Sequence, residues 1–156
     1  MNNDDKYMSR CIQLAEQALE SGNPPVGSVL VLDGIIIGEG IESGKSSGDV
    51  TDHAEILAIR NAIKNGFGKH LPKAILYSTH EPCMMCSYVI RHHHIPHILF
   101  GISVEYVGGF TSVFKILTTE KVPKWGKPPI VSMGIGREDC EMLNKKFELK
   151  KSKLNS

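Results

Sequence analysis

The sequence predicts an α/β fold, a three-layer α/β/α sandwich around a five-stranded mixed sheet whose last two strands are parallel. Short runs of apolar and β-branched residues recur five times along the 156 residues, and segments with helical spacing flank most of them. Segment 103–129, between the last two strands, is too long for a hairpin and suits a crossover between parallel strands. One domain, residues 1–156, fits this length, with residues 151–156 predicted to be a frayed tail.

The first half of the chain is predicted to contain a helix, a β-hairpin and a second helix. Helical spacing of apolar residues marks the first helix, and Asp33-Gly34 marks the tight turn of the hairpin. The predicted elements are a helix at 8–19 ended by 21–25, strands at 26–32 and 35–37, a polar glycine-rich loop at 38–52 and a helix beginning at His53.

The second half is predicted to contain three strands and two helices around the crossover. The apolar stretch 113–117 predicts that the crossover is helical. The predicted elements are a strand at 74–78, a helix carrying Cys83 and Cys86, strands at 97–102 and 130–133, and a final helix at 137–150.

Composition indicates an ordinary globular protein. Hydrophobic residues make up 41% of the chain and charged residues 22%, and the net charge of +1 provides no strong field for attracting nucleic acid. The acidic start is unlike a secretory leader, and no apolar run is long enough for a membrane span. Four cysteines without a disulfide-like pattern suit a reducing compartment. We therefore expect a cytoplasmic protein without a membrane partner.

Two short motifs carry the chemistry: His53-Ala54-Glu55 and Glu81-Pro82-Cys83-Met84-Met85-Cys86. One histidine and two cysteines provide three zinc ligands and leave the fourth tetrahedral position open, as in catalytic rather than structural zinc sites. Glu55, two residues past the histidine, need not bind the metal and can transfer protons. This combination, H-x-E followed by P-C-x-x-C, is the signature of zinc deaminases.

The spacing of the motifs predicts that two helix starts build the site. Cys83 and Cys86 are three residues apart and share a helix face, and Pro82 suits the first helical turn. A helix N-terminus favours thiolates over thiols. Apolar residues at helical spacing follow His53, so its helix would present its first turn to the same ion.

Alternative interpretations exist for the metal-binding residue types. A lone C-x-x-C occurs in redox pairs and in closed zinc sites, but Cys11 and Cys140 are isolated and form no second pair. His92-His93-His94 with His97 could form a second metal site, although the polar end of the cysteine helix and its turn is the favoured interpretation. The C-terminal lysines are interpreted as a solvated helix end rather than as an RNA-contacting patch; they are Lys145, Lys146, Lys150, Lys151 and Lys153.

The chain resembles the cytidine deaminase-like superfamily, and within it the branch of tRNA adenosine deaminase, guanine deaminase and fungal-type cytosine deaminase. The two zinc motifs carry the resemblance, together with segments 25–29, 38–40, 76–79, 100–101 and 108–109. The resemblance implies one Zn²⁺ per chain, held by His53, Cys83 and Cys86, with a bound water or hydroxide. It also implies that Glu55 passes protons to the ring and the leaving amine, and that the protein is a homodimer.

Glu42 departs from the pattern of that branch, whose members usually carry an asparagine after the second strand to contact the base. An ionised glutamate only accepts hydrogen bonds, so the substrate would present an N–H group there. The alternative is that Glu42 is an exposed loop residue. Glu42 and Pro82 are the candidate substrate contacts, whereas Tyr106, Phe110 and Trp125 are expected to pack.

These residues predict a hydrolytic deaminase of an aminated nucleobase or related heterocycle, guanine-like by preference. The alternative substrate is the wobble adenosine of tRNA. It ranks second because Glu42 at the pocket mouth would repel a phosphate backbone. A non-catalytic zinc-binding module is the third possibility, and it would require Glu55 to be misplaced.

Overall fold

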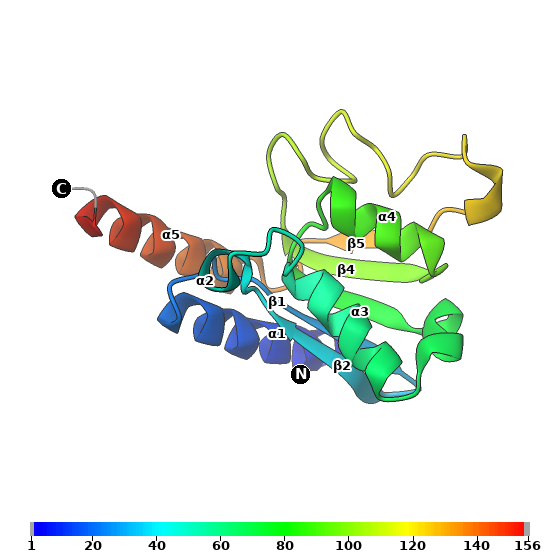
Figure 1. Cartoon of the computed structure of the whole chain (residues 1–156), viewed down its shortest axis with the longest axis horizontal. Helices are drawn as coiled ribbons and strands as arrows, with labels where there is room; N and C mark the ends of the chain where they lie inside the picture. The colour runs from blue at the N-terminus through cyan, green and yellow to red at the C-terminus, as the bar shows by residue number, and fades with distance from the viewer. Residues whose placement is uncertain (1, 155–156) are drawn as a thin grey trace.

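The computed structural model, which describes residues 2–154, confirms the α/β class and the five-stranded mixed sheet (Figure 1). The strands are β1 (Gly27–Leu32), β2 (Ile35–Ile41), β3 (Ile75–His80), β4 (His97–Ile102) and β5 (Ile130–Met133). Their order is β2-β1-β3-β4-β5; β1 is antiparallel to both neighbours, and β3, β4 and β5 are mutually parallel, as predicted for the last two. Asp33 and Gly34 have φ of 49° and 79°, as the predicted tight turn requires.

Helices cover both faces of the sheet and complete the predicted three layers. They are α1 (Asn3–Glu20), α2 (Gly44–Ser47), α3 (Ala54–Lys64), α4 (Met84–His92) and α5 (Arg137–Leu154), with the 3₁₀ helices η1 (Gly68–Lys73) and η2 (Pro123–Trp125). Helix α1 packs on β1 and β3 and against α5, whereas α3 packs on β1 and β2 and contacts α4. Figure 1 shows α5 running alongside α1 and projecting past the sheet.

Each central strand contributes side chains to both layers of helices because side chains alternate along a strand. Leu30, Leu76 and Ile98 belong to the core beneath α3 and α4. Their neighbours Val29, Tyr77 and Leu99 belong to the core beneath α1. The two cores hold β3 rigidly, and β3 leads directly into the second zinc motif.

Strand β2 is longer than predicted, since Gly38 and Gly40 lie in the strand rather than in a loop. A Cβ atom on Gly38 would overlap the carbonyl of Ala58, and one on Gly40 would overlap the carbonyl of Ala54. These glycines therefore allow α3 to pack directly on the strand. The close packing places His53, which immediately precedes α3, near the end of β2.

The prediction of a helical crossover is wrong, because segment 103–129 consists of turns and the short η2. The side chain of Arg91, only 2% exposed, hydrogen-bonds to the backbone of this segment, which forms no α-helix. The Arg91 guanidinium donates to the carbonyls of Ile116, Leu117, Thr119 and Gly126 at 2.9–3.3 Å. These bonds pair four carbonyls of the segment without a helix, and turns within it pair others.

Both terminal helices extend beyond their predicted ends. Helix α1 begins at Asn3 because the side chain of Asn2 accepts a hydrogen bond from the Asp5 N–H at 2.8 Å. Helix α5 continues to Leu154, so the predicted tail at 151–156 is helical in its first four residues, and 155–156 lie outside the described residues. Among helices in the described part of the chain, none combines the length and apolarity needed to cross a membrane.

Candidate active site and metal centre

Two helix starts bring the predicted metal ligands together. His53 is the N-cap of α3 and Cys83 is the N-cap of α4, while Cys86 lies in the first turn of α4. Pro82 precedes the cap instead of occupying the first helical turn, which corrects the predicted position. Both cap residues have extended backbones, so each side chain points away from its own helix towards the space between the two.

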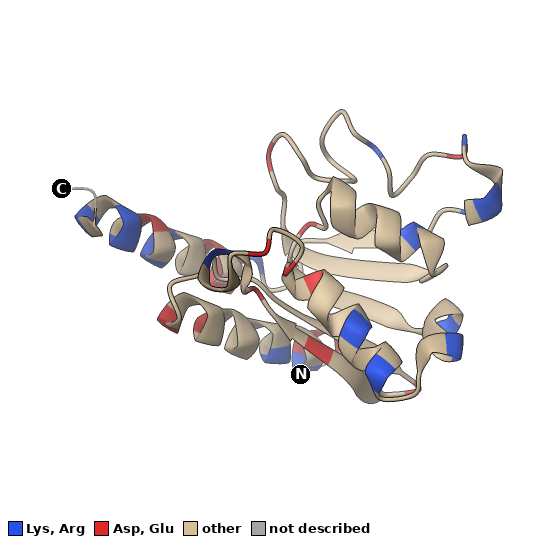
Figure 2. Cartoon of the chain, viewed as in Figure 1, with Lys and Arg blue, Asp and Glu red and all other residues tan. Residues whose placement is uncertain are grey.

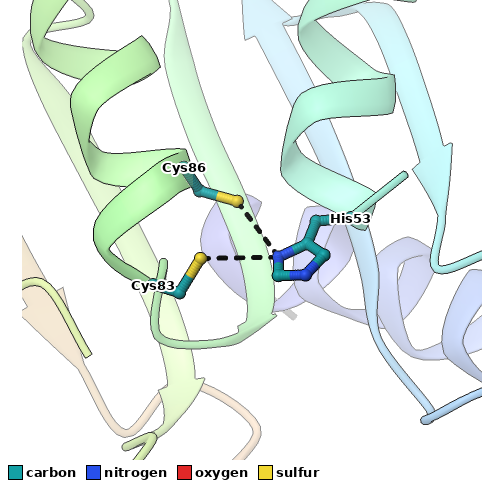
Figure 3. A group of neighbouring side chains, drawn as sticks. All are labelled: His53, Cys83 and Cys86. Carbon is teal, nitrogen blue, oxygen red and sulfur yellow. Dashed lines mark hydrogen bonds between the residues drawn. The ribbon is translucent and has the colours of Figure 1, made fainter. Parts of the chain in front are cut away.

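The three ligand atoms fit a zinc ion (Figure 3). His53 Nδ1 lies 3.4 Å from Cys83 Sγ and 3.5 Å from Cys86 Sγ. Nitrogen at about 2.1 Å and sulfur at about 2.3 Å from a tetrahedral zinc would lie about 3.6 Å apart, close to the observed distances. These side chains form the one group with suitable donor atoms that the described residues contain. The donor set and its spacing therefore match zinc.

The three ligands differ in protonation when no metal is bound. Hydrogen bonds from Cys86 and His53 lower the pKa of the Cys83 thiol to about 4. The hydrogen bond with Cys83 raises the pKa of His53 to about 9. A separate hydrogen bond between Cys86 and Cys83, together with burial, raises the pKa of the Cys86 thiol. Cys83 is thus held as a thiolate, the form of cysteine that binds zinc. His53 and Cys86 keep their protons in the metal-free chain, so zinc binding displaces a proton from each.

Glu55 lies beside the ligands as a candidate proton carrier. Its side chain is 3% exposed; Oε1 accepts a hydrogen bond from Ser78 Oγ at 2.7 Å, and Oε2 lies 3.5 Å from Cys86 Sγ. Burial raises the pKa of this carboxyl to about 7. A carboxyl that titrates near neutrality can both accept and return a proton.

A cavity of about 250 Å³ opens onto this group. It is lined by Pro24, Val26, Glu42, His53, Glu55, His80, Glu81, Cys83, Val104 and Val107. Glu42 is 7% exposed, and its Oε2 accepts a hydrogen bond from the Gly44 N–H at 3.0 Å. The alternative interpretation, that Glu42 is an exposed loop residue, is therefore wrong. Pro82 is buried next to the cavity but does not line it, and its contact with substrate stays a prediction.

His80 is a lining residue that the sequence analysis missed. Its Nε2 lies 2.8 Å from Asn144 Oδ1 of α5, and its Nδ1 lies 2.9 Å from Thr79 Oγ1. Burial lowers the pKa of His80, which favours the neutral ring. The sequence did contain a signal for His80, because it is a polar residue at the carboxyl end of β3, which is parallel to β4. Ligands often bind beyond the carboxyl ends of parallel strands.

Some of the remaining residues singled out in the sequence are buried in the structure, and others are exposed. His92 ends α4 and His93 and His94 form the following turn, as favoured. Phe110 packs against the core and Trp125 is buried, as expected. Tyr106 is 77% exposed, so the expectation that it packs is wrong: its position on a turn, with φ of 70°, turns the ring away from the core.

Comparison with known proteins identifies the family. Residues 1–102 match the family model of the cytidine and deoxycytidylate deaminase zinc-binding region. The chain belongs to this deaminase family. The described fold, the donor set and the family together make it a zinc-dependent hydrolytic deaminase.

Several relatives of the deaminase are named tRNA-specific adenosine deaminase. The protein from Streptococcus pyogenes serotype M1 is 34% identical over 90% of this chain and 81% of its own length. The protein from Haemophilus influenzae is 38% identical over 88% and 78%, and that from Aquifex aeolicus is 34% identical over 91% and 92%.

Solved structures extend the comparison to two substrate classes. A structure from studies of A-to-I editing by tRNA:A34 deaminases superposes with a TM-score of 0.80 and 31% identity, covering 88% of this chain and 98% of that chain. Guanine deaminase from Bacillus subtilis gives a TM-score of 0.61 and 36% identity over 66% of each chain. The comparisons thus support the alternative substrate of the sequence analysis better than a guanine-like base.

Proposed function

We propose that the deaminase converts adenosine to inosine in tRNA, at the wobble position. The observation that carries this proposal is its similarity, over about nine-tenths of the chain, to tRNA-specific adenosine deaminases. In the overall reaction, water replaces the amino group at C6, and the products are a carbonyl group and ammonia.

Residues of the cavity provide the proton transfers. Zinc, when bound by His53, Cys83 and Cys86, supplies the Lewis acid that makes water acidic enough to lose a proton near neutrality. Glu55 accepts that proton, returns it to the ring nitrogen, and then assists the departure of the amino group as ammonia. Ser78 holds the Glu55 carboxyl in place through its hydrogen bond.

The surroundings of the cavity support a substrate larger than a free base. Pro24, Glu42 and His53 also line an adjoining hollow of about 350 Å³, which offers room for the rest of a nucleotide. The hydrogen bond between His80 and Asn144 ties α5 to the cavity wall. Figure 2 shows basic residues along the outer half of α5, where they could follow a phosphate backbone.

The charge of Glu42 opposes this proposal less than the sequence analysis expected. The carboxyl is buried and accepts a hydrogen bond from the Gly44 N–H, which offsets part of its charge, although Glu42 also lines the adjoining hollow. In the proposed complex, its other oxygen accepts a hydrogen bond from the substrate.

A second candidate substrate is a free aminated base of the guanine type. The observation favouring it is again Glu42, because a carboxylate accepts from the N–H groups of guanine and finds no donor on the ring nitrogens of adenine. In the adenosine complex a ribose hydroxyl would have to provide that donor.

One assay separates the two candidates. Zinc-loaded protein is incubated with an anticodon stem-loop carrying adenosine at the wobble position, the same stem-loop with inosine, and free guanine, adenine and cytosine. We expect ammonia from the adenosine stem-loop alone. Turnover of guanine without turnover of the stem-loop would overturn the proposal in favour of the free base.

Replacement of Glu42 by asparagine is expected to lower kcat/KM for the adenosine stem-loop about tenfold, and so to change its preference over free bases, since a hydrogen bond to a charged acceptor contributes about 1.5–3 kcal/mol. The measurement is kcat/KM for each substrate. Glu39→Gln is the matched control, because Glu39 lies on β2, which ends one residue before Glu42, but pairs with Arg10 at the surface instead of lining the cavity. An unchanged preference in Glu42→Asn would remove Glu42 from the substrate contacts.

A cytoplasmic location is supported by a tRNA substrate and by four free cysteines. The homodimer that the resemblance implies stays a prediction.

A further inference from the structure

The buried carboxylate of Glu81 accepts four hydrogen bonds, all from one loop, residues 104–111. The side chain is 2% exposed. Its Oε1 accepts from the Val104 N–H at 2.9 Å and from Thr111 Oγ1 at 2.6 Å. Its Oε2 accepts from the Phe110 N–H at 2.8 Å and the Thr111 N–H at 2.7 Å. Each oxygen therefore receives two donors, which fills the lone-pair sites of a carboxylate.

The loop bound by Glu81 forms one wall of the catalytic cavity. Val104 and Val107 line this cavity together with Glu81 itself. The same loop is hydrogen-bonded to the turn that carries the first cysteine ligand: the Met84 N–H donates to the Val107 carbonyl at 2.9 Å, and the Gly109 N–H donates to the Pro82 carbonyl at 2.8 Å. The wall and the ligand turn thus form one hydrogen-bonded unit.

Two glycines allow the loop to approach so closely. A Cβ atom on Gly108 would overlap the Glu81 carboxylate, and a Cβ atom on Gly109 would overlap the side chain of Ser87 on α4. Segment 103–129 contains no α-helix. Inside residues 104–111, the Val107 N–H donates to the Glu105 carbonyl and the Gly108 N–H to the Val104 carbonyl, and these bonds shape the turn without joining it to the start of α4. The carboxylate adds four hydrogen bonds that join this turn to Glu81, just before α4.

We propose that Glu81 is a positioning residue that holds residues 104–111 against the start of α4 and so shapes the substrate-binding wall. The inference rests on the proposed function for its kinetic consequence, but the anchoring itself is independent of the substrate. Glu81 takes no part in proton transfer, since all of its acceptor sites are occupied.

Glu81→Gln tests the anchor with almost no change of shape. Whichever carboxylate oxygen the amide nitrogen replaces, it faces at least one backbone N–H, so a donor meets a donor. We expect amide hydrogen exchange, measured by NMR on zinc-loaded protein, to become faster at Val104, Phe110 and Thr111 and to stay unchanged in α1. We expect KM for the adenosine stem-loop to rise about tenfold with little change in kcat.

Thr111 provides a milder pair of variants should Glu81→Gln fail to fold. Thr111→Val removes one donor to Oε1 and keeps the side-chain shape, whereas Thr111→Ser keeps the hydroxyl. We expect faster exchange at Val104 and a KM increase of about threefold in Thr111→Val, and wild-type behaviour in Thr111→Ser.

Two results would overturn the inference: unchanged exchange at the three amides, or a fall in kcat without a change in KM. If no substrate is turned over by the parent protein, the proposed function fails. The exchange rates still decide whether Glu81 anchors the wall.

Discussion

Glu55→Gln is expected to lower kcat by roughly a thousandfold, because a positioned general acid–base group contributes about 10²–10⁴-fold. The amide retains an oxygen for the hydrogen bond from Ser78 but can no longer accept and return the proton. Zinc content, measured by atomic emission, should remain one ion per chain because Glu55 is not among the three ligand residues. Turnover is measured as ammonia release from the adenosine stem-loop.

Stability measurements separate this loss of chemistry from unfolding. Burial raises the pKa of Glu55, which means that the folded metal-free chain disfavours its charged form. The neutral glutamine should therefore leave the melting temperature of the metal-free protein unchanged or higher. Glu55→Ala should also retain zinc and lose turnover. Substantial activity in either variant would contradict the assignment of Glu55 as the proton carrier.

Removal of zinc is expected to abolish turnover and to lower the melting temperature by roughly 10 °C. The reference is protein in free zinc at a thousand times the dissociation constant, where zinc binding stabilises the fold by about 4 kcal/mol. The stabilisation arises because the metal binds a site that exists only when α3 and α4 are packed together. Calorimetry with and without a chelator measures the shift, and readdition of zinc should restore both properties.

Cys86→Ser extends the same test to a single ligand, and it should reduce zinc content well below one ion per chain. Cys140→Ser is the matched control, because Cys140 is equally buried but lies on α5, outside the ligand group. Equal zinc content in the two variants would argue against the assigned ligand set.

Much of the fold could be predicted because its signals are local. Strand alternation and the Asp33-Gly34 turn fix the hairpin over a few residues, and the predicted bounds of β4 and β5 agree with the structure. The errors occur where distant groups replace local hydrogen bonds. Gly38 and Gly40 look like loop residues until α3 packs against them, and the crossover looks helical until Arg91 binds its carbonyls.

The sequence by itself determined which chemistry to expect of this deaminase. It predicts that His53, Cys83 and Cys86 bind zinc and that Glu55 transfers protons, and the spacing places the ligands at two helix starts. The tertiary structure alone decided what surrounds the substrate. It decided between the two interpretations of Glu42 by placing this residue in the cavity wall, and it added His80 and Val107 to that wall. A ligand set depends on residue type and short-range spacing, whereas a cavity wall depends on long-range packing, here the contacts of Glu81 with a loop more than twenty residues away.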